Sequence, residues 1–291
     1  MSLRKNLKLA QLYASSWVRQ RRQIELFDGI ETYCMFVGYP RTGHSLIGSL
    51  LDAHPNIAIA HELDALNLLK RGFSRNQLFH LLLENSRQMA AAGRRHSGYS
   101  YEVPNQWQGR FSSLKVIGDK KGATSAMHLY RNPKLFDLLE RKIDKQLKLV
   151  HVIRNPYDVL TTMTRRSPRR SLEDNIEIFF QLCSSIAALK RRLQPRQLFD
   201  LRLETFIAAP RPVLADLCAF LQLEADPAYL EDSAAIVFSS PKKSRFDLDW
   251  PGDTISKVAE RMAAYEFLAT YRFVEDDTDP AVSRPPIGLE S

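Results

Sequence analysis

Short apolar runs alternate along this chain with longer stretches in which apolar residues recur at helical spacing. The runs lie at 33–37, 57–60, 114–117, 147–153 and 198–203. Runs of this length are typical of strands buried on both faces. Helical spacing covers 7–24, 45–51, 63–93, 174–193 and 210–221, and one more helix is expected from Pro156, with Asn155 as its N-cap. This alternation predicts an α/β fold with a central parallel sheet and helices on both faces.

The chain shows no internal repeat and no linker, so we expect a single domain at residues 31–273. Within it, 63–112 is expected to be a helical insertion over one end of the sheet. The insertion closes with an aromatic loop at 99–112 that contains proline and glycine. Residues 274–291 hold five acids and three prolines, which predicts a disordered acidic tail.

Residues 1–30 precede the domain as a basic amphipathic arm. Its first 22 residues contain six bases and no acid. Apolar residues recur through the arm at Leu9, Leu12, Tyr13, Trp17 and Ile24. Two interpretations stay open: a helix packed on the domain surface, or an arm that docks weakly on a membrane surface or a partner.

The composition is that of a globular protein. Of 291 residues, 44% are hydrophobic and 25% are charged, which excludes a disordered chain, a collagen-like repeat and a disulfide-dense mini-protein. No apolar run approaches the ~18 residues that a membrane-spanning helix needs, so no transmembrane segment is expected. Cys34, Cys183 and Cys218 are too scattered for a disulfide framework or a zinc site. Because no secretory signal is seen either, we expect a reducing, cytoplasmic location.

The charge is distributed unevenly, which narrows the choice of partner. The formal net charge is +8, an excess that favours an anionic partner. Within the body of the chain, residues 141–171 alone hold nine bases and two acids. Nucleic-acid binders more often spread their bases along a face. The local excess therefore favours a small anionic ligand, and no nucleic-acid partner is expected.

A glycine-bearing loop is the first candidate for an anion site. Residues 38–45, GYPRTGHS, follow an expected strand and open an expected helix. They fit the phosphate-loop pattern G-x-x-x-x-G-K-[ST] except that His44 replaces the lysine. Backbone N–H groups and the helix dipole hold anions in such a turn, and Arg41 supplies a fixed positive charge. The missing lysine makes a triphosphate an unsuitable ligand. The alternative is an ordinary strand–turn–helix junction.

A second candidate follows the strand expected at 147–153. Arg154 lies at its carboxyl edge, which is where open α/β sheets bind ligands. Thr162 lies two turns into the next helix, so its hydroxyl is expected to face the same crevice. A guanidinium with a hydroxyl suits a terminal phosphate. The alternative is a structural arginine that caps the sheet edge.

The two motifs together resemble those of sulfotransferases that use 3′-phosphoadenosine 5′-phosphosulfate (PAPS). The resemblance covers about residues 33–273. Residues 39–45 are similar to the family's 5′-phosphosulfate loop, and 152–159 to its 3′-phosphate motif, with Thr162 where a serine is usual. Residues 201–206, with the helix after Pro210, are similar to a later strand and helix of the family, and 241–245 to a basic loop over the cofactor.

This resemblance implies a P-loop-NTPase-like topology and PAPS as cofactor, with 3′-phosphoadenosine 5′-phosphate as the product. No metal is required, and the sequence offers no convincing metal cluster. The implied acceptor is a hydroxyl, or as second choice an amine, of a small molecule or a carbohydrate. The implied cofactor-binding residues are Arg41, Thr42, Gly43, His44, Ser45, Arg154, Thr162, Lys242, Lys243 and Arg245.

The resemblance also implies catalytic residues. Arg41 would stabilise charge on the bridging oxygen, and Lys120 would approach the sulfuryl group. Glu62 is the first choice for the base that takes the acceptor proton, and His61 is the second. The alternative role for Glu62 is to cap the helix after it. Aromatic residues of the insertion are expected to line the acceptor or adenine pocket: Tyr99, Tyr101 and Trp107.

Three other functions remain as alternatives. A P-loop nucleotide kinase would bind ATP with Mg²⁺, although His44 argues against it. A nucleic-acid-binding module that uses the basic arm would show an affinity that falls steeply with salt and survives loss of Arg41 and Arg154. A degenerate family member would bind the nucleotide without turnover.

Overall fold

The computed structural model describes residues 3–96 and 98–274, and side chains from residue 6 onward. Within them, five strands form a parallel sheet in the order β2–β5–β1–β6–β7. Their bounds are β1 Thr32–Gly38, β2 Ile57–Ala60, β5 Val116–Asp119, β6 Gln146–Ile153 and β7 Leu198–Arg202. A separate antiparallel hairpin joins β3 (Arg95–His96) to β4 (Tyr99–Ser100). The expected α/β fold with a central parallel sheet is confirmed.

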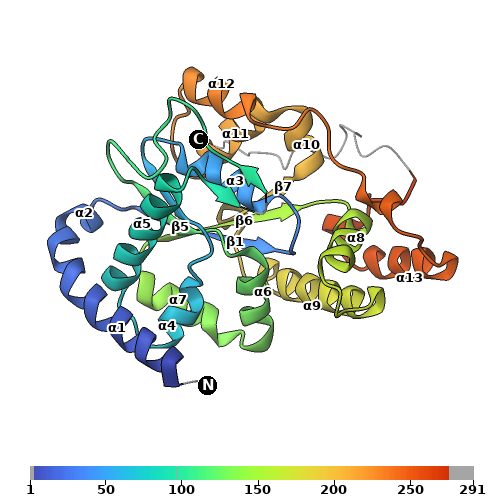
Figure 1. Cartoon of the computed structure of the whole chain (residues 1–291), viewed down its shortest axis with the longest axis horizontal. Helices are drawn as coiled ribbons and strands as arrows, with labels where there is room; N and C mark the ends of the chain where they lie inside the picture. The colour runs from blue at the N-terminus through green and yellow to red at the C-terminus, as the bar shows by residue number, and fades with distance from the viewer. Residues whose placement is uncertain (1–2, 97, 275–291) are drawn as a thin grey trace.

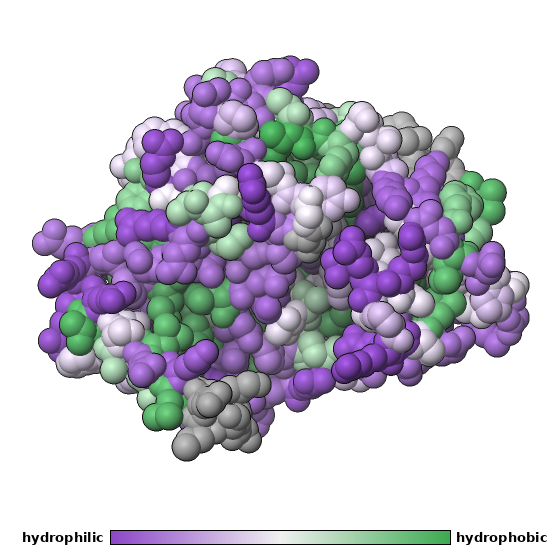
Figure 2. All heavy atoms as spheres, viewed as in Figure 1, coloured by the Kyte–Doolittle hydropathy of each residue, from purple (hydrophilic) through white to green (hydrophobic). Residues whose placement is uncertain are grey.

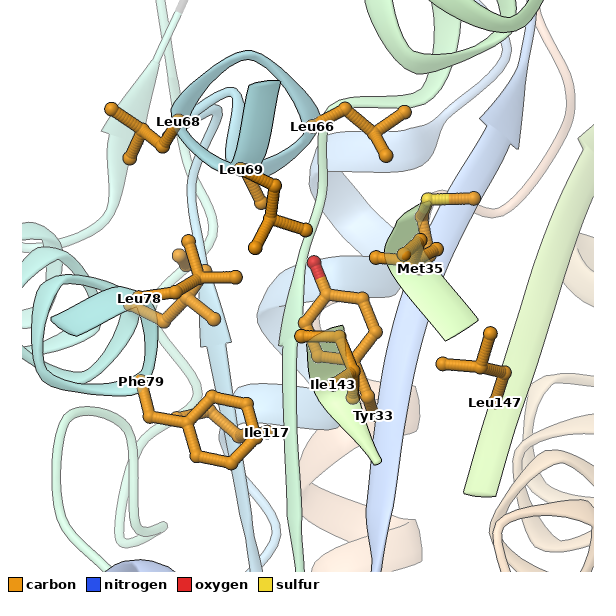
Figure 3. Close-up of a cluster of buried hydrophobic side chains, with 14 of the residues drawn as sticks. Tyr33, Met35, Leu66, Leu68, Leu69, Leu78, Phe79, Ile117, Ile143 and Leu147 are labelled. Atoms are coloured by element: carbon orange, nitrogen blue, oxygen red, sulfur yellow. The ribbon is translucent and has the colours of Figure 1, made fainter. Parts of the chain in front are cut away.

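Alternate residues of β1 point into two different cores, because successive side chains of a strand face opposite sides of the sheet. Tyr33 and Met35 belong to one core and Cys34 and Phe36 to the other. Figure 3 shows the first core, where Tyr33 and Met35 lie among leucines of α4 and α5. Its helices include α2 (Ile24–Asp28), α4 (Ala65–Lys70), α5 (Arg75–Ala91) and α7 (Lys134–Ile143).

The opposite face is covered by helices from both halves of the chain (Figure 1). They are α3 (His44–Asp52), α10 (Leu203–Ala208), α11 (Pro210–Phe220) and α12 (Pro227–Ala235). A third cluster surrounds Tyr39 and Tyr157 at the carboxyl end of the sheet. It is built by α6 (Gly122–Arg131), α8 (Pro156–Arg166), α9 (Leu172–Lys190) and α13 (Gly252–Ala263). Short 3-10 turns complete the described elements: η1 (Gln20–Gln23), η2 (Pro195–Gln197), η3 (Ser244–Asp247) and η4 (Glu266–Leu268).

The N-terminal helix α1 (Leu3–Arg19) packs on α5. Leu9 and Leu12 lie against the first core, and Ser16 is buried. The Gln77 amide donates to the Ser16 hydroxyl at 3.2 Å and to the Tyr13 carbonyl at 3.0 Å. One face of the helix is therefore fixed to the domain. In the part of the chain that the structure describes, no helix is both long and apolar enough to cross a membrane.

Several boundaries differ from those that the sequence predicts. The helical stretch expected at 63–93 is broken between α4 and α5, where Gly72 has φ +90° and Ser74 forms a capping box with Gln77. The strand expected at 114–117 begins two residues later, at Val116. Helices α6 and α7 lie at 122–143, where no element is predicted. The acidic tail expected at 274–291 lies, apart from Val274, outside the described residues.

Candidate functional site

A cavity of about 1070 Å³ opens at the carboxyl end of the sheet, the edge at which ligands bind in this class of fold. Its walls come from the β1–α3 loop, the residues after β5, helix α8, helix α10 and the segment 238–244. Among the described lining residues, Glu62 is the single carboxylate. The seven lysines and arginines of the lining are Arg41, Lys120, Lys121, Arg154, Arg165, Arg166 and Lys242.

The β1–α3 loop, the candidate anion loop, lines this cavity. Arg41 and Gly43 have positive φ, 67° and 90°, and Gly43 is the N-cap of α3. A Cβ on Gly43 would lie 2.7 Å from Cδ1 of Leu203, so the position also lacks room for a side chain. The turn leads directly into α3, whose free N–H groups and dipole favour an anion. Arg41 is exposed and lines the cavity beside Ser45.

The His44 ring lies beneath the loop, although its backbone begins α3. Its Nε2 is 3.2 Å from the Val37 carbonyl, and its Nδ1 is 3.0 Å from the Thr42 hydroxyl. Burial lowers the pKa of His44 to about 3, so the ring is neutral at pH 7. A neutral ring donates to Val37 from Nε2 and accepts from Thr42 at Nδ1. The histidine therefore braces the loop and does not take the part of a phosphate-binding lysine.

Lys120 lies at the centre of a polar network on the cavity wall. Its buried ammonium donates to the Ser45 hydroxyl at 3.1 Å and to Glu62 Oε1 at 3.0 Å. Nζ also lies 3.4 Å from Nε2 of His61. Its side chain passes over α3 at Gly48, where a Cβ would lie 2.8 Å from Cγ of Lys120. The network joins the anion loop to the expected base.

The charges of this network determine the protonation states of the two candidate bases, Glu62 and His61. Burial raises the pKa of Glu62, but the ammonium groups of Lys120 and Lys121 outweigh it and lower that pKa to about 2. Burial, with help from Lys120, lowers the pKa of His61 to about 4. At pH 7, Glu62 is therefore ionised and His61 is neutral. Glu62 lines the cavity, and His61 is not among the described lining residues.

A buried carboxylate, Asp119, fixes the backbone around Glu62. Asp119 accepts hydrogen bonds from the N–H groups of Leu63 at 3.1 Å and Ala65 at 2.9 Å. Glu62 and Asp64 both have positive φ, 61° and 68°. Non-glycine residues rarely hold this conformation without support from their surroundings. Asp119 thus orients the loop that presents Glu62. The N–H of Ala65, the first residue of α4, donates to Asp119, whereas the Glu62 carboxylate pairs with Lys120 and Lys121.

Arg154 ties the anion loop to the basic segment on the far side of the cavity. Its Nη1 donates to the Arg41 carbonyl at 3.0 Å, and its Nη2 donates to the Lys242 carbonyl. Its Nε is buried and has no hydrogen-bond partner in the described residues. Thr162 also lines the cavity, and its hydroxyl donates to the Asp158 carbonyl at 2.8 Å. Both residues of the second motif therefore reach the cavity.

Three residues expected at the cofactor are not in the described lining: Thr42, Lys243 and Arg245. Arg245 is fully buried, and its guanidinium and N–H donate to the two carboxylate oxygens of Asp158 at 3.0 and 2.7 Å. This pair anchors η3 beneath α8. Lys243 is exposed outside the cavity, whereas Lys242 lines it. Thr42 is a buried residue of the loop, and its hydroxyl lies 3.1 Å from the Tyr39 carbonyl and 3.0 Å from Nδ1 of His44.

Aromatic side chains form another part of the cavity lining. Tyr99 and Tyr101 line it, as expected, and Tyr99 meets Phe238 edge-on with ring centroids 5.8 Å apart. Trp107 is not among the described lining residues: its backbone N–H donates to the Ala53 carbonyl at 3.1 Å, and Arg110 lies over its ring. The side chains of this wall are therefore mostly aromatic or apolar, with Leu203 and Ile207 completing it.

The hairpin that carries Tyr99 is anchored by Asp52, the last residue of α3. Asp52 accepts from the buried guanidinium of Arg94 and from the N–H of Gly109 at 3.0 Å. Its other oxygen accepts from the Ile59 N–H at 2.6 Å and the Ser86 hydroxyl at 2.7 Å. One carboxylate thus joins α3, β2, α5 and both ends of the hairpin segment.

His96, on the same hairpin, lies close to the expected base Glu62. The sequence did not predict this position of His96. Its ring meets that of His61 with centroids 4.5 Å apart, and it lines the cavity. His61, Glu62 and His96 bring ligand atoms within 4.8 Å of one another, a grouping that metal ions use. The Lys120 ammonium, however, lies against two of the three and would repel a cation.

Several other lining residues were also not predicted from the sequence. Arg165 and Arg166 lie one turn beyond Thr162 on α8, and the excess of bases at 141–171 was the available signal. Phe238 and His96 come from segments without a motif. Their contribution depends on how two distant loops meet across the cavity, which no local pattern encodes.

Comparison with known proteins bears on this geometry. A family model described as the Sulfotransferase family matches residues 35–227. The sulfotransferase domain from the curacin biosynthetic pathway is 14% identical over 81% of this chain and 98% of that chain, with a TM-score of 0.51. Sulfotransferase STF1 from Mycobacterium tuberculosis H37Rv is 14% identical over 87% of this chain and 81% of that chain, with a TM-score of 0.50. No curated protein matches the sequence. At these identities the two structures bear on the fold alone.

Proposed function

Because this chain belongs to the Sulfotransferase family, we propose that it transfers a sulfuryl group from PAPS to a hydroxyl of a small-molecule or carbohydrate acceptor. The observation that carries the proposal is the charge of the cavity. Seven lysines and arginines and one carboxylate line it in the described chain. A concave site with one sign of charge concentrates ligands of the opposite sign. PAPS bears anionic groups at two separated positions, and the cations come from both the β1–α3 loop and helix α8.

One structural feature, a buried arginine nitrogen, supports the fit of such a cofactor. The buried Nε of Arg154 has no hydrogen-bond partner in the described residues, although such atoms are normally paired. An anionic oxygen would satisfy it. Arg154 and Thr162 would hold the 3′-phosphate, and the N–H groups of the β1–α3 loop, with Arg41 and Ser45, would hold the 5′-phosphosulfate. When bound, PAPS supplies an activated sulfuryl group and leaves as 3′-phosphoadenosine 5′-phosphate.

The chain's own groups supply the rest of the chemistry. The Glu62 carboxylate is ionised, lines the cavity and would accept the proton of the acceptor hydroxyl. Lys120 lies between Ser45 and Glu62, so its ammonium can stabilise negative charge on either side of the transferring group. The pKa of Glu62 rises when Lys120 turns from it toward an anion, which makes Glu62 a stronger base at that moment.

The wall beside Glu62 indicates how an acceptor would bind. Tyr99, Tyr101 and Phe238 present ring faces and edges there, and Leu203 and Ile207 add apolar surface. Such a wall stacks on a planar ring or on the apolar face of a sugar. The acceptor hydroxyl would then project toward Glu62.

Calorimetric titration with 3′-phosphoadenosine 5′-phosphate, with and without Mg²⁺, tests this proposal. We expect binding that is tighter than that of AMP and indifferent to Mg²⁺. Arg154→Met should weaken it by about tenfold or more, the cost of a lost charge-assisted hydrogen bond. The matched control is Arg211→Met, at an exposed arginine outside the cavity. Affinity equal to that of AMP, or an absolute need for Mg²⁺ with ATP, would overturn the proposal.

A further inference from the structure

The outward face of α1 carries several exposed apolar side chains. Leu7 is 56% exposed, Trp17 46% and Val18 60%. Ala10 and Ala14 are exposed between them. The spacing from residue 7 to 10, 14 and 17 places these side chains on one stripe of the helix. Exposed apolar residues scattered singly need no explanation, but a continuous stripe marks an interaction surface.

The stripe is not needed to hold α1 on the domain, because the opposite face already does so. Leu9 and Leu12 pack on the core, and buried Ser16 accepts a hydrogen bond from Gln77. The helix is therefore apolar on two sides. One side is occupied by its own domain, and the other faces solvent along the edge of the molecule.

Bases flank the stripe. Lys8, Arg19 and Arg22 are exposed, and the Arg21 guanidinium lies 3.9 Å from the centroid of the Trp17 ring. The first 22 residues hold six bases and no acid, and Glu25 is the first acid of the chain. A tryptophan beside basic residues on an exposed helix face is the composition of helices that lie in the interface of a bilayer.

We propose that this face of α1 docks the protein peripherally on a membrane surface that contains anionic phospholipid. Charge decides the occupant: a second copy would place one basic helix against another, whereas an anionic lipid surface complements it. The apolar stripe would enter the region below the headgroups, and the flanking bases would meet the phosphates. Neither part of this proposal rests on the sulfotransferase chemistry.

The placement of α1 leaves the candidate site accessible in the docked state. In Figure 1, α1 lies at the lower left, whereas the carboxyl ends of β1 and β6 point to the right. Figure 2 shows hydrophobic groups among hydrophilic ones along that lower left edge. Docking through α1 would therefore leave the cavity open to solvent, and nucleotide affinity should be the same with and without vesicles.

Co-sedimentation with vesicles tests the proposal. The intact protein should pellet with phosphatidylcholine vesicles that contain phosphatidylserine, remain in solution with phosphatidylcholine alone, and be released by high salt. The double variant Trp17→Ala, Val18→Ser should lower partitioning by about tenfold or more. Tyr130→Ser is the matched control, at an aromatic residue of α6 that is 44% exposed. Circular dichroism and urea unfolding show whether each variant is folded.

A second pair of variants separates charge from apolar contact. Arg19→Glu with Arg22→Glu should abolish partitioning onto anionic vesicles, while Arg131→Glu, at an exposed arginine of α6, should not. Equal partitioning onto neutral vesicles, or none onto anionic ones, would overturn the proposal. So would a monomer–dimer equilibrium in solution that Trp17→Ala abolishes, because the stripe would then belong to a second copy.

Discussion

Gly122 leaves the space that the His44 ring fills. A Cβ built on Gly122 would lie 2.5 Å from Nε2 of His44. Gly122 begins α6, while His44 begins α3, so the contact joins the segment after Lys120 to the anion loop. The two positions are therefore coupled: a residue with a side chain at 122 requires a smaller residue at 44.

Gly122→Ala should destabilise the protein by about 1–3 kcal/mol, since overpacking forces a buried ring from its position. In the His44→Ser background the same change should cost little, because the ring is gone. Urea unfolding of the four proteins in this double-mutant cycle measures the coupling. Equal costs of Gly122→Ala in both backgrounds would show that the clash is relieved elsewhere.

Glu62→Gln should lower turnover by about 10²–10⁴-fold, the usual contribution of a positioned general base. The amide keeps the size of the side chain but accepts no proton. Affinity for 3′-phosphoadenosine 5′-phosphate should change little, and kcat measured with PAPS and a reactive acceptor reports the loss. His61→Gln is the comparison: if it abolishes turnover while Glu62→Gln does not, the base is His61.

Lys120→Met should move the acid limb of the kcat/KM profile upward by about one pH unit or more. The Lys120 ammonium is the largest of the influences that hold the pKa of Glu62 near 2, and without it that pKa rises toward its ordinary value. Activity that needs the carboxylate is then lost at higher pH. Lys121→Met, which removes the more distant partner at 3.4 Å, should cause a smaller shift. Identical profiles for the three proteins would exclude this electrostatic coupling.

The segments that meet at the cavity could largely be predicted because each is encoded locally. The strand, the glycine-bearing turn and Arg41 are contiguous in sequence, and so are β6, Arg154 and the start of α8. Residues whose role depends on packing were harder to place. Arg245 is a cation in a basic loop, yet it turns inward because Asp158 lies buried beneath it.

The missed elements have similar physical causes. Helix α6 contains glycine, threonine and serine in its first turn, so its apolar spacing is weak. The expected strand at 114–117 included Leu114, which is buried but precedes the ladder. The first residue of β5 is set by its pairing of Val116 with Thr32 of β1, a partner distant in the chain.

The stability of the protein should fall between pH 7 and pH 5 in a way that His44 helps to set. Its pKa is about 3 in the folded chain against 6.5 ordinarily, so over this range the unfolded chain binds a proton that the folded chain does not. The free energy of unfolding therefore decreases as pH falls, and His44 accounts for about 2 kcal/mol of the decrease. His44→Gln should flatten the profile by that amount in urea unfolding at the two pH values. An unchanged slope would mean that the ring is protonated when folded.

Helix α3 serves both halves of the proposed reaction. Its first turn closes the anion loop, and its last residue, Asp52, holds the hairpin of the acceptor wall through Arg94 and Gly109. Nine residues at 1.5 Å each set these ends about 13 Å apart. Related proteins can therefore differ in their preferred acceptor through differences in residues 95–108. The distance between the proposed donor and acceptor sites, which α3 sets, would stay the same. A graft of that segment from another sulfotransferase should succeed only where the two anchoring contacts to Asp52 are kept.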